Sequence, residues 1–193
     1  KSMSAKGTLI PIGGNEDKGN GKNERYTLEY IQDGILSRVV RESGGTEATI
    51  VVIPTASSIP VEVSQNYLDA FQKLGCKNVH IMDIRSRADA DHPDFLNLLK
   101  KADCVMFSGG DQSKIVKYIG GSALDGIIKD KYENEDFVIA GTSAGAMCMS
   151  EEMITGGGVR EAFTKGAVKI GRAHVELQLR GHLVCRLLLE KKN

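Results

Sequence analysis

Short runs of apolar, mostly β-branched residues recur along the chain, and a Gly, Pro or Asp follows each run within two residues. These runs are too short for a globular helix, whereas a buried strand needs only about four to eight residues. The pattern therefore predicts five strands, at Thr8–Ile12, Thr49–Ile53, Asn78–Met82, Cys104–Phe107 and Phe137–Ala140.

Apolar residues between these runs have the spacing of three and four that is typical of amphipathic helices. They are Ile31, Ile35 and Val39, then Val63, Tyr67, Ala70, Phe71 and Leu74, then Phe95, Leu98 and Leu99, and last Leu124, Ile127, Ile128 and Tyr132. Strands that alternate with helices favour right-handed crossovers and a parallel sheet buried on both faces. We therefore expect an α/β fold, a three-layer αβα sandwich with a mostly parallel sheet.

The composition limits the function classes without choosing among them. The 193 residues, 41% hydrophobic and 26% charged, suffice for one compact domain. Lys plus Arg and Asp plus Glu each total 25, so no net basic field favours a nucleic-acid or membrane partner. The four cysteines are widely spaced, and no apolar run reaches the roughly 20 residues of a membrane span. We expect no metal, no cofactor and no disulfide framework.

In parallel α/β sheets the ligand crevice lies at the carboxyl ends of the strands, so the loops that follow the strands are the place to look for chemistry. Four of these loops are Gly13–Lys18, Pro54–Ser57, Ser108–Gln112 and Gly141–Gly145, and three of the four contain glycine. The last has the pattern Gly-x-Ser-x-Gly after a predicted buried strand, which is typical of a nucleophile elbow.

The elbow predicts Ser143 as an attacking nucleophile on a strained turn. The N–H of Ala144 at the start of the next helix and the N–H of Gly110 in a neighbouring loop are the expected oxyanion donors. Two other interpretations stay open. The pattern can arise by chance as a tight turn in a chain with 22 glycines, or the loops can cradle phosphate, although no dinucleotide or P-loop fingerprint is present.

Four segments, Gly13–Lys18, Asp83–Ala88, Ser108–Gln112 and Gly141–Ala146, resemble the cyanophycinases in order and spacing. These are serine peptidases of family S51 with a flavodoxin-like, class I glutamine amidotransferase-like fold. The resemblance covers about Gly7 to Lys169. Class I amidotransferases use a cysteine at the elbow, whereas this chain has serine there, and we expect Cys148 to be a packing residue.

The resemblance implies an exopeptidase that cleaves cyanophycin, a poly-aspartate with arginine on each side chain, into β-aspartyl-arginine dipeptides. It implies Ser143 as the nucleophile and Gln112, with Asp111 beside it, as substrate-binding residues. Aspartyl dipeptidases, the nearest relatives, carry Asn-Thr where this chain has Asp111 and Gln112. They stay an alternative, as does a non-catalytic module that binds an amino-acid-like ligand. The expected compartment is the cytoplasm, with a secreted form as the alternative, and a homodimer is considered.

A serine hydroxyl needs a general base, normally histidine. His80 lies in a predicted strand and His92 opens the third predicted helix, so we expect both to be structural or solvated. His174 and His182 follow the point where the resemblance stops, and the Asp-x-His-Phe motif that carries the base in the family is not found. We therefore expect little or no peptidase activity from this chain.

The segment from about Ile170 has an unusual explanation. Ile170–Val175 is what ATCGGAAGAGCACACGTC encodes, and Leu183–Lys191 is what CTCGTATGCCGTCTTCTGCTTGAAAAA encodes. Both strings resemble a common sequencing-library adapter. An amphipathic basic helix is the ordinary interpretation of the same residues. We expect residues 7–169 to form a peptidase domain that is incomplete at its C-terminus, and residues 170–193 to be a non-native tail.

Overall fold

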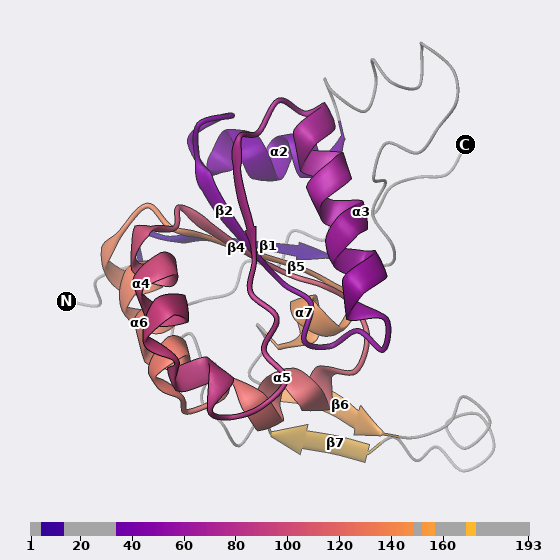
Figure 1. Cartoon of the computed structure of the whole chain (residues 1–193). Helices are drawn as coiled ribbons and strands as arrows, with labels where there is room; N and C mark the ends of the chain where they lie inside the picture. Colours follow the sequence, from indigo (N-terminus) through magenta and orange to yellow (C-terminus); the bar gives the residue numbers. More distant parts are fainter. Residues whose placement is uncertain (1–4, 14–33, 149–151, 157–168, 173–193) are drawn as a thin grey trace.

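The computed structural model describes residues 5–13, 34–148, 152–156 and 169–172, and Figure 1 shows the arrangement of their helices and strands. In chain order the elements are β1 (Thr8–Ile12), α2 (Ile35–Glu42), β2 (Thr49–Ile53), α3 (Pro60–Lys73), β3 (Asn78–Ile81), the short 3-10 helix η1 (Asp89–Asp91), α4 (Pro93–Lys101), β4 (Cys104–Phe107), α5 (Gln112–Tyr118), α6 (Ala123–Asn134), β5 (Val138–Thr142), α7 (Ala144–Met147), β6 (Glu152–Gly156) and β7 (Lys169–Arg172).

The central sheet has five strands in the order β1-β5-β4-β2-β3, and every neighbouring pair is parallel. Strand β5 therefore lies between β1 and β4, which brings the carboxyl ends of these three strands side by side. The predicted α/β class and mostly parallel sheet are confirmed.

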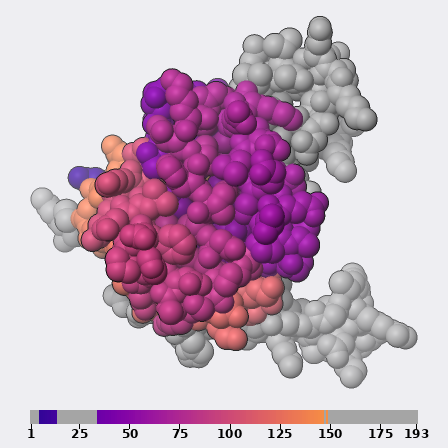
Figure 2. Space-filling model, viewed as in Figure 1, coloured from indigo at the N-terminus to yellow at the C-terminus, as the bar shows by residue number. Residues whose placement is uncertain are grey.

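Two hydrophobic clusters, one on each face, complete the three layers. Alternate residues of β2 point to opposite faces: Ile50 and Val52 belong to the cluster of α2 and α3, whereas Val51 and Ile53 belong to the cluster that contains residues of α4, α5 and α6. All four side chains are fully buried, and each such burial contributes about 1.5–3 kcal/mol to folding. In the space-filling view the violet surface of α3 adjoins the magenta-to-orange surface of the other helical layer (Figure 2).

The bounds of most strands agree with those predicted from the apolar runs of the sequence. Strands β1, β2 and β4 have the predicted bounds, and β3 ends one residue early, at Ile81. Strand β5 runs to Thr142 instead of ending at residue 140, because Gly141 and Thr142 stay in register with Pro11 and Ile12 of β1. Pairing with a neighbour, not hydrophobicity, sets this end of the strand.

Four elements were not predicted from the sequence: η1, α5, β6 and β7. Helix α5 buries only Ile115, so its apolar pattern is weak. The antiparallel pair β6–β7 is separate from the main sheet, and β7 includes the first residues of the expected foreign tail. The rest of that tail, and the predicted helical position Ile31, lie outside the described residues. No helix in the described ranges is long and apolar enough to cross a bilayer.

Candidate active site

Ser143 occupies a sharp turn between β5 and α7 at the carboxyl edge of the sheet. Its backbone has φ 50° and ψ −104°, and it is the only non-glycine residue with positive φ in the part of the chain that the structure describes. Such a conformation costs about 1–3 kcal/mol and persists only where surrounding contacts impose it. One such contact is the Ser143 N–H, which donates to the carbonyl of Ile12 at 2.9 Å. The residue is solvent-exposed, and the predicted strained elbow is confirmed.

Close packing on both sides of the turn holds the elbow. A Cβ at Gly145 would lie 2.7 Å from both the Cβ and the carbonyl oxygen of Phe107, so only glycine lets α7 approach β4 in this way. On the opposite face, the hydroxyl oxygens of Tyr67 and Thr142 lie 3.5 Å apart, and both residues are buried. The turn that presents Ser143 is thus held by β4 on one side and by α3 on the other.

The loop after β4 lies beside Ser143. A Cβ at Gly109 would lie 3.6 Å from the Cβ of Ser143, which is ordinary contact distance. Gly110 has φ +139°, and a Cβ there would lie 2.0 Å from the carbonyl oxygen of Ala56. Glycine is therefore required at position 110 for both conformation and space. The predicted donor Gly110 is thus the next residue after Gly109, which lies beside the elbow.

Ala144, the other predicted donor, is the first residue of α7. The first N–H groups of a helix have no intrahelical acceptor, so the Ala144 N–H is available to a group at the elbow. The Ala144 side chain itself is fully buried. The donor roles of Gly110 and Ala144 stay predictions, with geometry that suits them.

Asp111 is the N-cap of α5, a role that the sequence analysis did not assign to it. Its Oδ1 accepts from the N–H of Ser113 at 2.9 Å and from the Ser113 hydroxyl at 2.6 Å. These bonds, the hydroxyl first, lower the pKa of the Asp111 carboxyl, which is therefore ionised at neutral pH. Gln112 is the half-buried first residue of α5. Substrate binding by either residue stays a prediction.

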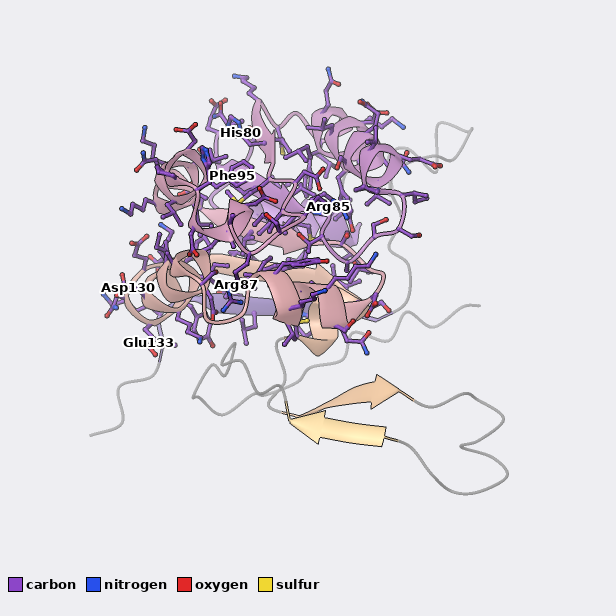
Figure 3. All side chains as sticks on the ribbon, turned by 60° about the horizontal axis from the view of Figure 1, so that its bottom comes forward. His80, Arg85, Arg87, Phe95, Asp130 and Glu133 are labelled. Atoms are coloured by element: carbon purple, nitrogen blue, oxygen red, sulfur yellow. The ribbon has the colours of Figure 1, made fainter. Side chains whose placement is uncertain are left out.

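The segment 83–88 fixes loops instead of offering reactive groups. The Arg85 guanidinium donates to the Asp83 carboxylate and to the carbonyls of Pro54 and Ser57, which belong to the loop after β2. Arg87 donates to the carbonyls of Lys117 and Gly120 at the end of α5. Figure 3 labels both arginines, which serve different parts of the molecule although one residue separates them. From the sequence, this segment was used only for its resemblance to a family, and no role was predicted for it.

Neither described histidine is placed as a base for Ser143. His80 is an exposed residue of β3, which β2 and β4 separate from β5, and Figure 3 shows it at the rim of the molecule. His92 is the N-cap of α4, where its Nδ1 accepts from the Asp94 N–H at 3.3 Å. The predicted strand position of His80 and the predicted position of His92 at the start of a helix are confirmed, and His80 is solvent-exposed. His174 and His182 lie outside the described residues.

Cys148 is not an alternative nucleophile. Its side chain is buried, and burial raises the pKa of its thiol to about 12, so the thiolate does not form at neutral pH. The predicted packing role is confirmed. Across the described ranges, no group of three or more His, Cys, Asp or Glu side chains could hold a metal ion.

Similarity to proteins of known fold agrees with this geometry. The structure of a peptidase from an acI-B1 Actinobacterium is similar with a TM-score of 0.58 and 24% identity, over 78% of this chain and 59% of that one. A structure of a putative peptidase E protein from Listeria monocytogenes EGD-e is similar with a TM-score of 0.53 and 18% identity, over 84% of this chain and 67% of that one. At these identities the likeness shows a shared fold.

Similarity at the level of sequence is more specific. The cyanophycinase of Geminocystis herdmanii (strain PCC 6308) is 30% identical over 161 residues, which are 83% of this chain and 55% of that protein. The chain spans about half the length of the curated cyanophycinases it matches. The model of peptidase family S51 matches residues 19–165, which include the elbow and every other described loop at the carboxyl edge except Gly13. With most of its length matched by that model, the chain belongs to peptidase family S51.

Proposed function

We propose that this chain carries the nucleophile of a serine-type exopeptidase that hydrolyses cyanophycin to β-aspartyl-arginine dipeptides. The observation that carries the proposal is the strained, exposed Ser143 beside the Gly109–Gly110 turn. Similarity to curated cyanophycinases supports the choice of substrate class.

In the proposed reaction, the Ser143 Oγ attacks the carbonyl carbon of a backbone peptide bond near the end of the polymer. The hydroxyl proton passes to a general base, and the carbonyl oxygen becomes an oxyanion. The N–H groups of Gly110 and Ala144 stabilise that oxyanion. Collapse of the tetrahedral intermediate breaks the C–N bond, the base protonates the leaving amine, and an acyl-enzyme ester on Ser143 remains. Water, deprotonated by the same base, then attacks the ester carbonyl. Collapse of this second intermediate breaks the bond to Ser143 Oγ, which takes the proton back from the base, and the acyl product leaves as a carboxylic acid.

Substrate recognition must be local, because the chain as a whole has no net charge. The amide of Gln112 can both donate and accept, which suits the peptide groups of the polymer. The ionised carboxylate of Asp111 suits the guanidinium of a substrate arginine. In this proposal the carboxylate binds the guanidinium and caps α5 at the same time. Neither described histidine, His80 or His92, is assigned as the base.

Two measurements test the proposal. In the gene product translated from the source DNA beyond codon 169, a fluorophosphonate probe should label Ser143, located by peptide mass spectrometry, and the Ser143→Ala variant should stay unlabelled. The gene product translated from the source DNA beyond codon 169 should release β-aspartyl-arginine from cyanophycin, measured by liquid chromatography and mass spectrometry. An unlabelled Ser143 together with an inert longer product would refute the serine mechanism.

The aspartyl-dipeptidase alternative shares the fold, as the likeness to a putative peptidase E protein illustrates. It predicts release of aspartate from small dipeptides, without dipeptide release from cyanophycin. Parallel incubations of the longer product with both substrates distinguish the two activities. The non-catalytic alternative predicts neither product and no labelling of Ser143.

A further inference from the structure

Arg85 connects the loop after β3 to the loop after β2. Its Nε donates to Asp83 Oδ1 at 2.5 Å, and its two terminal nitrogens lie 3.3 Å from the Ser57 carbonyl oxygen and 3.4 Å from that of Pro54. The planar guanidinium can span two carbonyls at once, which a lysine ammonium cannot do in the same geometry. Arg85 thus holds both ends of the turn 54–57.

Other bonds fix the same turn and Arg85 itself. The buried Thr55 hydroxyl donates to the carbonyl of Ile84 at 2.9 Å. The N–H of Ser57 donates to the carbonyl of Pro54 at 3.0 Å and closes the turn. The backbone at Arg85 is held in turn, because its N–H donates to Asp89 Oδ2 at 2.9 Å. The guanidinium therefore acts from an anchored backbone.

The turn 54–57 contacts the proposed oxyanion donor directly. The Ala56 carbonyl accepts from the Asp111 N–H at 2.8 Å. The same carbonyl oxygen would lie 2.0 Å from a Cβ at Gly110, so the backbone of Gly110 rests against it. Any shift of Ala56 must therefore move or rotate the peptide groups at Gly110 and Asp111.

We infer that Arg85 is a positioning residue for the oxyanion hole: by holding the Pro54 and Ser57 carbonyls, it fixes Ala56 and through it the direction of the Gly110 N–H. The inference rests on the proposed function in that Gly110 is taken as an oxyanion donor. Arg87 supplies a matched control, since it also donates to two backbone carbonyls, those of Lys117 and Gly120, but not to the turn 54–57.

The first test needs no catalysis. In the ¹⁵N-labelled chain, Arg85→Gln should speed amide hydrogen exchange at Asp111 about tenfold or more, because its acceptor Ala56 is released. Amides of α4 and α6 should keep their protection, which shows that the variant is folded. Arg87→Gln should leave exchange at Asp111 within about twofold of the parent chain. Equal exchange at Asp111 in all three proteins would overturn the inference.

The second test uses the gene product translated beyond codon 169, and it measures how well the oxyanion hole stabilises the negative charge that develops on the phosphoryl oxygen as Ser143 attacks the probe. At saturating fluorophosphonate, Arg85→Gln should lower the maximal labelling rate by roughly 10- to 100-fold, with the half-saturating probe concentration within about twofold. Arg87→Gln should leave both values nearly unchanged. Arg85→Lys keeps the charge but reaches one carbonyl, so its maximal labelling rate should lie between those of the parent and Arg85→Gln. Equal labelling of both glutamine variants would overturn the inference.

The two tests separate the inference from the proposed function. A gene product translated beyond codon 169 that the probe does not label counts against the serine chemistry, and the exchange measurement at Asp111 then decides on the link between Arg85 and Ala56. If Arg85→Gln does not fold, Arg85→Lys takes its place in both measurements.

Discussion

Gly110 packs against the carbonyl of Ala56 so closely that a Cβ at position 110 would lie 2.0 Å from the Ala56 oxygen. Its φ of +139° is also one that L-residues rarely adopt. Gly110→Ala should therefore force the two loops apart and lower the free energy of unfolding by about 1–3 kcal/mol or more. Urea unfolding followed by circular dichroism measures this loss.

The neighbouring glycine is the control for that variant. A Cβ at Gly109 would meet only ordinary contacts, 3.5 Å from the Thr142 carbonyl oxygen and 3.6 Å from the Ser143 Cβ. Gly109→Ala should therefore change the free energy of unfolding by less than about 1 kcal/mol. Equal losses for both alanine variants would contradict the close packing of Gly110 against Ala56.

Gly145 tests how tightly α7 packs on β4. Gly145→Ala places a Cβ 2.7 Å from the Cβ and the carbonyl oxygen of Phe107, and the backbone can yield only by moving the elbow. We expect a loss of about 1–3 kcal/mol in the free energy of unfolding.

A helical glycine with free space provides the comparison. A Cβ at Gly126 in α6 would meet nothing within 4 Å, so Gly126→Ala should gain up to about 1 kcal/mol from helix propensity. Thermal unfolding midpoints of the two variants should thus move in opposite directions. A rise for Gly145→Ala would show that α7 does not need glycine to approach β4.

The strained backbone of Ser143 should lower the free energy of unfolding of the chain. With φ 50° and ψ −104°, alanine keeps the strain, whereas glycine relieves about 1–3 kcal/mol of it at an entropic cost of about 0.5–1 kcal/mol. Ser143→Gly should therefore be more stable than Ser143→Ala by roughly 0.5–2 kcal/mol, and neither should react with a fluorophosphonate. Denaturant midpoints of the two variants measure the difference, and a less stable glycine variant would show that the turn is not strained.

The sequence was sufficient to predict those features whose determining residues are close together in the chain. The strained turn at Ser143 could be predicted because the glycines at 141 and 145 flank it between a strand and a helix. The sheet could be identified because strands buried on both faces, such as β2, are continuous apolar runs. Helix α5 was missed because one buried residue, Ile115, gives no periodic signal.

The supports of the site could not be predicted in the same way, because they join distant segments. Arg85 reaches carbonyls 28 and 31 residues away, and Ala56 meets Gly110 and Asp111 on another strand's loop. Nothing in the local sequence at Arg85 distinguishes it from Arg87, whose acceptors lie in α5 and just beyond it. Only the strand order, with β4 next to β2, brings these loops together.

Asp111 has a capping role in the structure and a predicted role in substrate binding, and two substitutions separate them. Asn caps a helix about as well as Asp, whereas Ala does not, so Asp111→Ala should lose about 1 kcal/mol of stability and Asp111→Asn little. If the charge also binds a substrate guanidinium, Asp111→Asn should weaken binding of β-aspartyl-arginine, measured by calorimetry, while its unfolding midpoint stays near that of the parent chain. Unchanged binding by Asp111→Asn would leave Asp111 as a cap alone.

Asp89 should make the stability of the chain depend on pH in the acid range. Its Oδ2 accepts from the N–H groups of Arg85 and Ser86 at 2.9 and 2.8 Å. The Arg85 N–H first, and then the Ser86 hydroxyl, lower the pKa of the Asp89 carboxyl in the folded state. Because that pKa lies below its value of about 3.9 in the unfolded chain, the ionised carboxylate stabilises the fold above about pH 4. This stabilisation is lost as the pH falls through the folded-state pKa.

Asp89→Asn removes the titrating group and keeps an oxygen that can accept both N–H bonds. The variant should therefore unfold at a lower temperature than the parent chain at pH 7, and the difference should shrink as the pH falls from about 5 to 2. Asp111, whose pKa is also lowered, keeps part of the acid sensitivity in both proteins. Asp69→Asn, on the exposed side of α3 where Asp69 bonds Gln65, controls for the loss of one negative charge. Parallel midpoint curves for Asp89→Asn and the parent chain would mean that Asp89 does not anchor the backbone of Arg85 through its charge.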